Sequence, residues 1–127
     1  MGKPADQAEP MVEQINDLRA QHGLPPLREA PKLMRSSEGF ARHLIRTDSF
    51  SHGSSYRATG FRTCGEMLAI RNGWKRARPA VLRMWKGSTT HRALMLSRSF
   101  RYVGASAVRG NFGGRATTIW VVHLGAR

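Results

Sequence analysis

Three side chains have the types that chemistry in a protein cleft requires: His52, Glu66 and His91. Two imidazoles and a carboxylate would suit a zinc ion with an open coordination position, and the carboxylate could also be the general base that activates water. Their separations of 14 and 25 residues match no local metal motif, so spacing alone selects no metal. From the residues alone, a structural polar cluster is the better interpretation, in which Glu66 binds loop amides or arginine and each histidine hydrogen-bonds to it.

The other candidates for chemistry have simpler interpretations. His123 shares an alternating face with Ile119 and Val121, which is typical of a satisfied, half-buried histidine. Cys64 is the single cysteine, and we expect a buried, inert thiol. The chain has no Gly-x-Ser-x-Gly elbow, no His-Glu-x-x-His motif and no phosphate-binding glycine loop, so a complete catalytic set is absent from the sequence.

The elements that must position these residues follow from hydrophobic periodicity and turn residues. Apolar residues at helical spacing predict three helices and a short fourth one: from Met11 to Gly23, from Pro31 to about Asp48, from Pro79, and from Ser88 or Thr89 to Leu96. Strand patterns cover residues 67–70, 102–108 and 117–124, and the last two predict a hairpin across residues 111–114. His91 then falls in the first turn of the short helix, whose positive end favours a neutral imidazole.

This order of elements predicts an α+β fold with a small, mainly antiparallel sheet. A chain of 127 residues has room for one domain, since two would each lack a sufficient core. Residues 1–10 are polar and contain proline, so we expect a flexible segment there and a single domain over residues 11–127. The small, polar residues 49–60 predict a loop long enough to be functional.

The charge of the chain is uneven. The net charge is +13, and the last acidic residue is Glu66, after which twelve Lys and Arg and no Asp or Glu follow. Such a field attracts polyanions, such as nucleic acid, anionic lipid headgroups or acidic envelope polymers. No basic cluster is interleaved with aromatic residues, and no recognition motif is present, so specific nucleic-acid binding is not expected. No stretch is long and apolar enough for a membrane span, and the N-terminus has no apolar run of a signal peptide.

An ordered series of short motifs resembles the bacterial branch of the CAP superfamily, or SCP-like domain, which holds cysteine-rich secretory, insect venom allergen and plant pathogenesis-related proteins. The series runs from about Val12 to Leu124 and consists of Ile15-Asn16-Asp17-Leu18-Arg19, Gly23-Leu24 with Leu27, Pro31-x-Leu33, Phe50-Ser51-His52, Gly65-Glu66, Trp85-x-x-Ser88-x-x-His91-Arg92 and Phe100-x-x-Val103-Gly104.

The resemblance implies an α-β-α sandwich with a central cleft in which His52, Glu66 and His91 converge. In eukaryotic relatives two histidines and two acidic residues meet there and can hold a divalent metal such as zinc. This chain has Ser88 at one acidic position and Met67 where the family usually has Asn, which implies a weaker metal site built on His52 and His91. Family members are mostly secreted, so the resemblance implies an extracellular or cell-envelope location with the leader removed.

Three functions follow as expectations. The first is a bacterial binding protein, secreted or attached to the envelope, whose cleft (His52, Glu66, Ser88, His91) and basic surface engage an anionic envelope component, lipid or protein. The second is a metal-dependent hydrolase, with His52 and His91 as ligands and Glu66 as ligand or base. In the third the His/Glu cluster is purely structural.

Overall fold

Four helices and four strands make up the chain in the computed structural model, which describes residues 5–53, 58–73 and 78–127. The helices are α1 (Ala5–Gln21), α2 (Pro31–Thr47), α3 (Arg78–Gly87) and α4 (Thr89–Met95). The strands are β1 (Arg28–Glu29), β2 (Thr63–Asn72), β3 (Tyr102–Phe112) and β4 (Arg115–Ala126). The predicted mixed fold and the predicted hairpin are therefore confirmed.

The strands form one sheet in the order β1-β3-β4-β2. The three long strands are antiparallel, and only the two-residue β1 pairs in parallel, with β3. The hairpin turns at Gly113 and Gly114, which both have positive φ, as the favoured two-residue hairpin turns require. β4 is thus central, and β2 is an edge strand.

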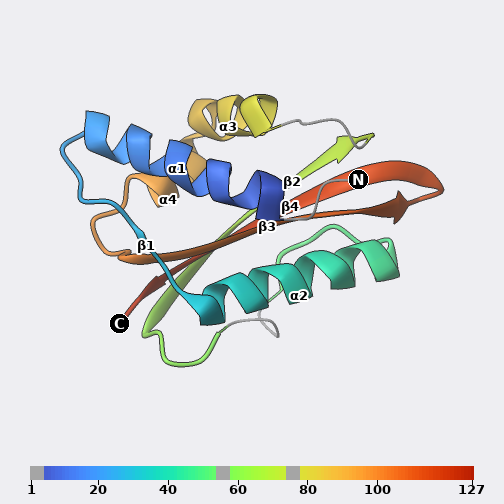
Figure 1. The fold of residues 1–127 in the computed structure, drawn as a ribbon, viewed down its shortest axis with the longest axis horizontal. Coiled ribbons are helices and arrows are strands. Elements are labelled where there is room, and N and C mark those ends of the chain that lie inside the picture. Colours follow the sequence, from blue (N-terminus) through green and yellow to red (C-terminus); the bar gives the residue numbers. More distant parts are fainter. Residues whose placement is uncertain (1–4, 54–57, 74–77) are drawn as a thin grey trace.

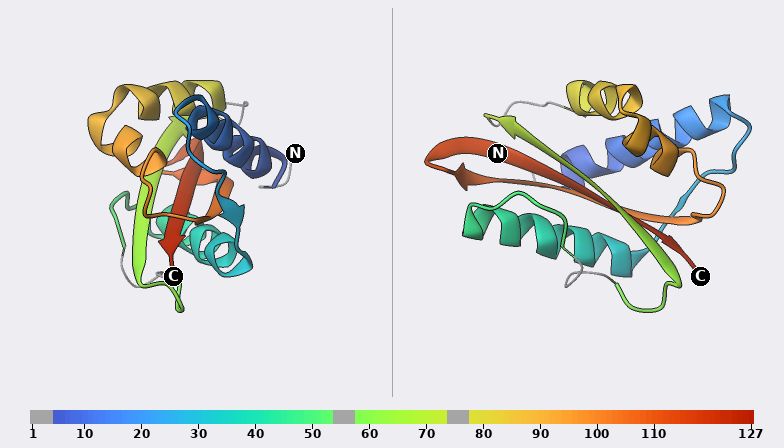
Figure 2. Two further views of the ribbon diagram at one scale, coloured as in Figure 1. Left: turned by 90° about the vertical axis from the view of Figure 1, so that its left-hand side faces the viewer. Right: turned by 180° about the vertical axis from the view of Figure 1, so that it is seen from behind.

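Helices cover both faces of this sheet (Figure 1). α2 lies along one face, and α1, α3 and α4 lie on the other; the view from behind and the end view in Figure 2 show the same three layers. β4 has the alternation that such burial requires. Ile119 and Val121 pack with Phe40 and Leu44 of α2, whereas the alternate residues join the core beneath the other helices. The arrangement is the expected α-β-α sandwich.

α2 approaches β3 closely at one glycine. A Cβ atom added at Gly104 would collide with the backbone of Leu33 and Met34 in the first turn of α2. The helix itself buries one stripe at helical spacing and ends at Asp48, which has φ 48° and whose N–H donates to the carbonyl of Leu44. The first turn of α2 is therefore held directly against the sheet.

The structure differs from the sequence-based expectations at two places. α1 begins at Ala5 and contains Pro10, so the helix starts before the predicted Met11, whereas the flexible segment 1–10 and the domain 11–127 stay predictions. β1 was not expected, because it is only two exposed residues long and is held by backbone hydrogen bonds such as that from the N–H of Arg28 to the carbonyl of Arg101 (2.8 Å). Residues 54–57 of the expected loop 49–60 lie outside the described residues.

Candidate functional site

Glu66 reaches the α2 side of the sheet because of its position in β2. Its neighbours at alternate positions, Leu68 and Ile70, pack against the α2 core, so the side chain of Glu66 lies on the same face. In the antiparallel pairing, Glu66 is directly opposite His123 of β4. Strand register therefore brings together two residues that are 57 positions apart in the sequence.

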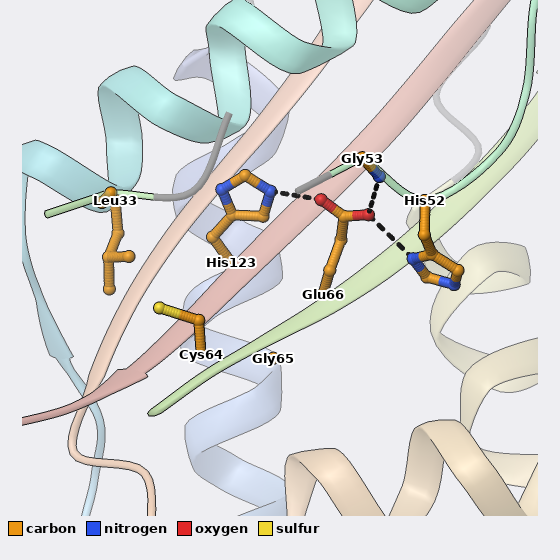
Figure 3. A pocket seen from close by; sticks show the side chains of 8 residues that line it. Leu33, His52, Gly53, Cys64, Gly65, Glu66 and His123 are labelled. Carbon is orange, nitrogen blue, oxygen red and sulfur yellow. Dashed lines mark hydrogen bonds and ion pairs between the residues drawn. The ribbon is translucent and has the colours of Figure 1, made fainter. Parts of the chain in front are cut away.

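Both oxygens of the Glu66 carboxylate are hydrogen-bonded (Figure 3). Nδ1 of His52 lies 2.7 Å from Oε1, and Nε2 of His123 lies 2.7 Å from Oε2. The backbone N–H of Gly53 also donates to Oε1, at 3.3 Å. Since an ionised carboxylate only accepts, both imidazoles donate to it. Glu66 thereby fastens the start of the loop after α2 to the sheet.

The two imidazoles differ in their surroundings. The His123 side chain is only 6% exposed, whereas that of His52 is 67% exposed. Nδ1 of His123 lies 2.7 Å from Oγ of Ser36 in α2, and that hydroxyl can also donate to the carbonyl of Leu33, at 3.2 Å. If His123 is neutral, its Nδ1 accepts the Ser36 hydroxyl. If it is charged, Nδ1 donates to Oγ of Ser36, and the Ser36 hydroxyl donates to the carbonyl of Leu33. Both nitrogens of the buried ring are therefore hydrogen-bonded in either protonation state.

The pKa of Glu66 is set by opposing effects. Burial of the carboxylate would raise the pKa, but the hydrogen bonds from His123 and His52, the charge of His123 and the N–H of Gly53 together lower it below its ordinary value. Glu66 is therefore ionised at neutral pH and fully engaged by its neighbours. A carboxylate in this state is a weak general base.

A cavity of about 410 Å³ opens beside this cluster. It has a polar side formed by His52, Glu66 and His123, and it is also lined by Leu33, Ala58 and Cys64. We call this cavity the cleft. The Cys64 side chain lies in it beside Leu33 and His123 (Figure 3), because residues 64 and 66 share one face of β2. Cys64 is partly exposed, which corrects the expectation of a buried thiol.

Ser88 and His91 form a pair of their own at the start of α4. Nδ1 of His91 lies 2.9 Å from Oγ of Ser88, and the ring stacks on that of Trp85 with 6.1 Å between centroids. Burial lowers the pKa of His91, and the charge of nearby His52 lowers it further. The lowered pKa agrees with the neutral imidazole expected from the sequence, and burial is its largest cause.

Neither Ser88 nor His91 is among the described residues that line the cleft, so their part in it stays a prediction. The described residues also contain no group of three or more His, Cys, Asp or Glu side chains placed to hold a metal ion. Nδ1 of His52 is hydrogen-bonded to Glu66, and Nδ1 of His91 is hydrogen-bonded to Ser88. Ser88 has a hydroxyl group where a metal site would need a carboxylate. This donor set does not fit a metal centre with three protein ligands.

Sequence reasoning missed two members of the site. The alternation around His123 predicted a satisfied, half-buried histidine, but the ring is buried, and its partner Glu66 was not predicted. Ser36 carried no signal, because a serine in the middle of a helix is most often without a distant partner. Strand register would have identified the pairing of Glu66 with His123, and the packing of α2 on the sheet would have identified Ser36; residue types alone specify neither.

The comparisons with known proteins agree with this architecture. Residues 12–124 match the sequence model of the CAP family, described as the cysteine-rich secretory protein family. Because this match covers most of the chain, the protein belongs to the CAP family. No curated protein sequence matches it significantly.

Several solved structures have the same fold. An outer surface protein of Borrelia burgdorferi superposes with a TM-score of 0.75 at 20% identity, covering 94% of this chain and 91% of the other. An extracellular SCP-domain protein of Bacillus anthracis gives 0.76 at 20% identity, covering 98% of this chain and 41% of the other. A cysteine-rich secretory protein of Staphylococcus aureus superposes with a TM-score of 0.76 at 16% identity, covering 98% of this chain and 39% of the other. The chain thus corresponds to about two fifths of the latter two proteins. Among the described residues, no helix combines the length and apolar character needed to cross a membrane.

Proposed function

We propose that this CAP domain is a bacterial binding module that acts outside the cell or at the cell envelope. The cleft beside Glu66 takes a ligand, and the basic surface engages an anionic envelope component, lipid or protein. The observation that carries this proposal is the cleft itself, a cavity of about 410 Å³; among the described residues that line it, Glu66 has the only carboxylate, and both of its oxygens are hydrogen-bonded. Such a cavity can hold a ligand, but its carboxylate is not free to activate water.

The chemistry of the cleft favours an amphiphilic ligand. Leu33 and Ala58 offer apolar contact, while Nε2 of the exposed His52 ring, whose Nδ1 donates to Glu66, offers one hydrogen-bonding group at the polar side. A ligand with a short apolar part and an anionic or polar head complements both. The extracellular and outer-surface descriptions of the similar bacterial proteins support a location in or beyond the envelope.

Long-range electrostatics supports an anionic partner. The net charge of +13 and the absence of any acidic residue after Glu66 create a positive potential that attracts polyanions. Attraction between exposed charges is screened over about 8 Å at physiological ionic strength, so this part of the binding must weaken in salt.

Co-sedimentation with lipid vesicles tests the proposal. We expect the protein to sediment with phosphatidylglycerol vesicles at low salt, to be released at high salt, and to stay in solution with neutral phosphatidylcholine vesicles. Equal binding to both vesicles would contradict the anionic partner, and binding to neither would exclude a lipid as that partner.

The metal-dependent hydrolase is the second candidate, and the neutral imidazole of His91 is the observation in its favour. Calorimetric titration of zinc into chelator-treated protein, beside the His52→Ala/His91→Ala variant, separates the two candidates. The binding module predicts no stoichiometric zinc binding that depends on these histidines. Stoichiometric binding that the double variant abolishes would favour the hydrolase instead.

A further inference from the structure

The hydroxyl of Ser36 begins a chain of hydrogen bonds that ends at Glu66. Its Oγ atom lies 2.7 Å from Nδ1 of His123, and Nε2 of the same ring lies 2.7 Å from Oε2 of Glu66. A nucleophilic side chain is activated in proteins when a base lies within hydrogen-bond reach and a third group orients that base. A hydroxyl, an imidazole and a carboxylate in this order meet both conditions. We call these three side chains the serine relay.

Glu66 determines which nitrogen of His123 is the base. Because the ionised carboxylate only accepts, it holds the proton of the neutral imidazole on Nε2, and the lone pair of Nδ1 then faces the Ser36 hydroxyl. The carbonyl of Leu33, at 3.2 Å, is the more distant of the two acceptors for that hydroxyl. Serine proteases use the two ring nitrogens in the opposite order, but either nitrogen can take a proton, so the roles are the same.

Ser36 lies beside the cleft. It is partly exposed, and its partner His123 is one of the residues that line the cleft. Leu33, about one helical turn earlier in α2, is another lining residue. About one turn after Ser36, the ring of Phe40 lies so close to Gly53, a further lining residue, that a Cβ atom there would collide with it. The stretch of α2 that contains Ser36 therefore borders the cleft, and the carbonyl group of a bound ligand can approach the hydroxyl.

We propose that Ser36 is the nucleophile of an acyl transfer in which a carboxylic ester, bound in the cleft, is hydrolysed. Oγ of Ser36 bonds to the carbonyl carbon while its proton moves to Nδ1 of His123, and Glu66 stabilises the resulting imidazolium. The bond from that carbon to the leaving alcohol then breaks, and the alcohol takes the proton from Nδ1. A water molecule repeats the two steps on the acyl-serine and releases the carboxylic acid. This activity goes beyond the proposed function, which requires only that a ligand is held.

Covalent labelling with a fluorophosphonate and hydrolysis of p-nitrophenyl acetate test the nucleophile. Peptide mass spectrometry should find the phosphonyl group on Ser36, and Ser36→Ala should lose the label and reduce the hydrolysis rate at least about tenfold. Ser37→Ala is the matched control, because the neighbouring hydroxyl contacts Oγ of Ser106 at 3.0 Å and has no place in the relay; it should keep the label and the rate. No label on Ser36 at saturating probe, or equal hydrolysis rates in the two variants, would overturn the proposal.

The role of the base is tested with His123→Gln and with pH. Glutamine keeps a polar side chain at this position, but its amide does not take the serine proton. In protein that thermal melting shows to be folded, we expect labelling of Ser36 to be at least about tenfold slower than in the wild type. Wild-type labelling should also slow in acid, because a protonated imidazole accepts no further proton. Unchanged labelling in the folded variant, or a wild-type rate that does not depend on pH, would overturn the relay.

Discussion

At the scale of single residues, Glu66 is the centre of the site because its carboxylate joins three parts of the chain. It binds the loop after α2 through His52 and Gly53, and it binds β4 through His123, which in turn contacts Ser36 of α2. We therefore interpret the cluster as structural as well as a wall of the cleft. The structural interpretation and the binding function are compatible, because a cleft needs rigid walls.

Replacing Glu66 should destabilise the protein in a pH-dependent way. In Glu66→Gln one amide group faces an imidazole donor, so we expect a loss of about 1–3 kcal/mol of unfolding free energy at neutral pH. Because the pKa of Glu66 is lowered in the folded state, its contribution is present above the ordinary pKa of glutamate and is lost as pH falls through the folded value. Urea unfolding at several pH values should show the difference between wild type and variant shrinking below about pH 4. A constant difference, or none at neutral pH, would argue against this role.

The two histidines that hold Glu66 should have unequal effects. His123→Ala leaves a buried void and deprives both Glu66 and Ser36 of a partner, so we expect a loss of about 2 kcal/mol or more. His52→Ala removes a largely exposed ring, so the stability should change by less than about 1 kcal/mol.

The effect of removing the His52 ring can also be measured locally, at the backbone N–H of Gly53. The N–H of Gly53 donates to Glu66, and His52 is its neighbour in the loop. In His52→Ala, hydrogen exchange at Gly53 should become faster while exchange in the central strand β4 is unchanged. Faster exchange throughout the sheet would show that His52 stabilises the whole fold instead.

At the scale of the elements, hydrophobic periodicity predicted the helices and strands that have a regular pattern of buried side chains. It missed the contacts that depend on backbone pairing between strands. α2 has a buried stripe that includes Leu33, Phe40 and Leu44, and the hairpin has alternating strands around a glycine turn, so both were predicted from the sequence. β1 has no such pattern, since its backbone alone joins β3. The pairing of Glu66 with His123 likewise depends on register between distant strands, which residue types do not specify.

The contact between α2 and β3 gives a test at this scale. Gly104→Ala would push a methyl group into the backbone of Leu33 and Met34, where no flexible side chain can move away. We expect a loss of about 3 kcal/mol or more, since overpacking against backbone exceeds the usual cost within a core. Gly87→Ala is the matched control, because nothing lies within 4 Å of a Cβ atom there. Similar melting temperatures for the two variants would show that α2 is not held in this close contact.

At the scale of the whole molecule, the cleft and the uneven charge carry the proposed binding. The cleft lies beside Glu66, and the part of the chain that follows Glu66, which has no acidic residue, supplies the positive charge. The sequence predicted the uneven charge and, through the family resemblance, a cleft with His52, Glu66 and His91, of which His52 and Glu66 are among the described lining residues.

The central claim is that the cleft holds a ligand, and Cys64 provides a direct reporter because it is the single cysteine and lines the cleft. The rate of its alkylation by iodoacetamide should fall several-fold when monomeric short-chain phosphatidylglycerol is added. In the Cys64→Ser/Met84→Cys variant, which places the thiol on the exposed face of α3, the rate should not change. Protection of Cys64 alone is the result that this account predicts. An unchanged rate at Cys64 under saturating lipid, or equal protection at both positions, would contradict it.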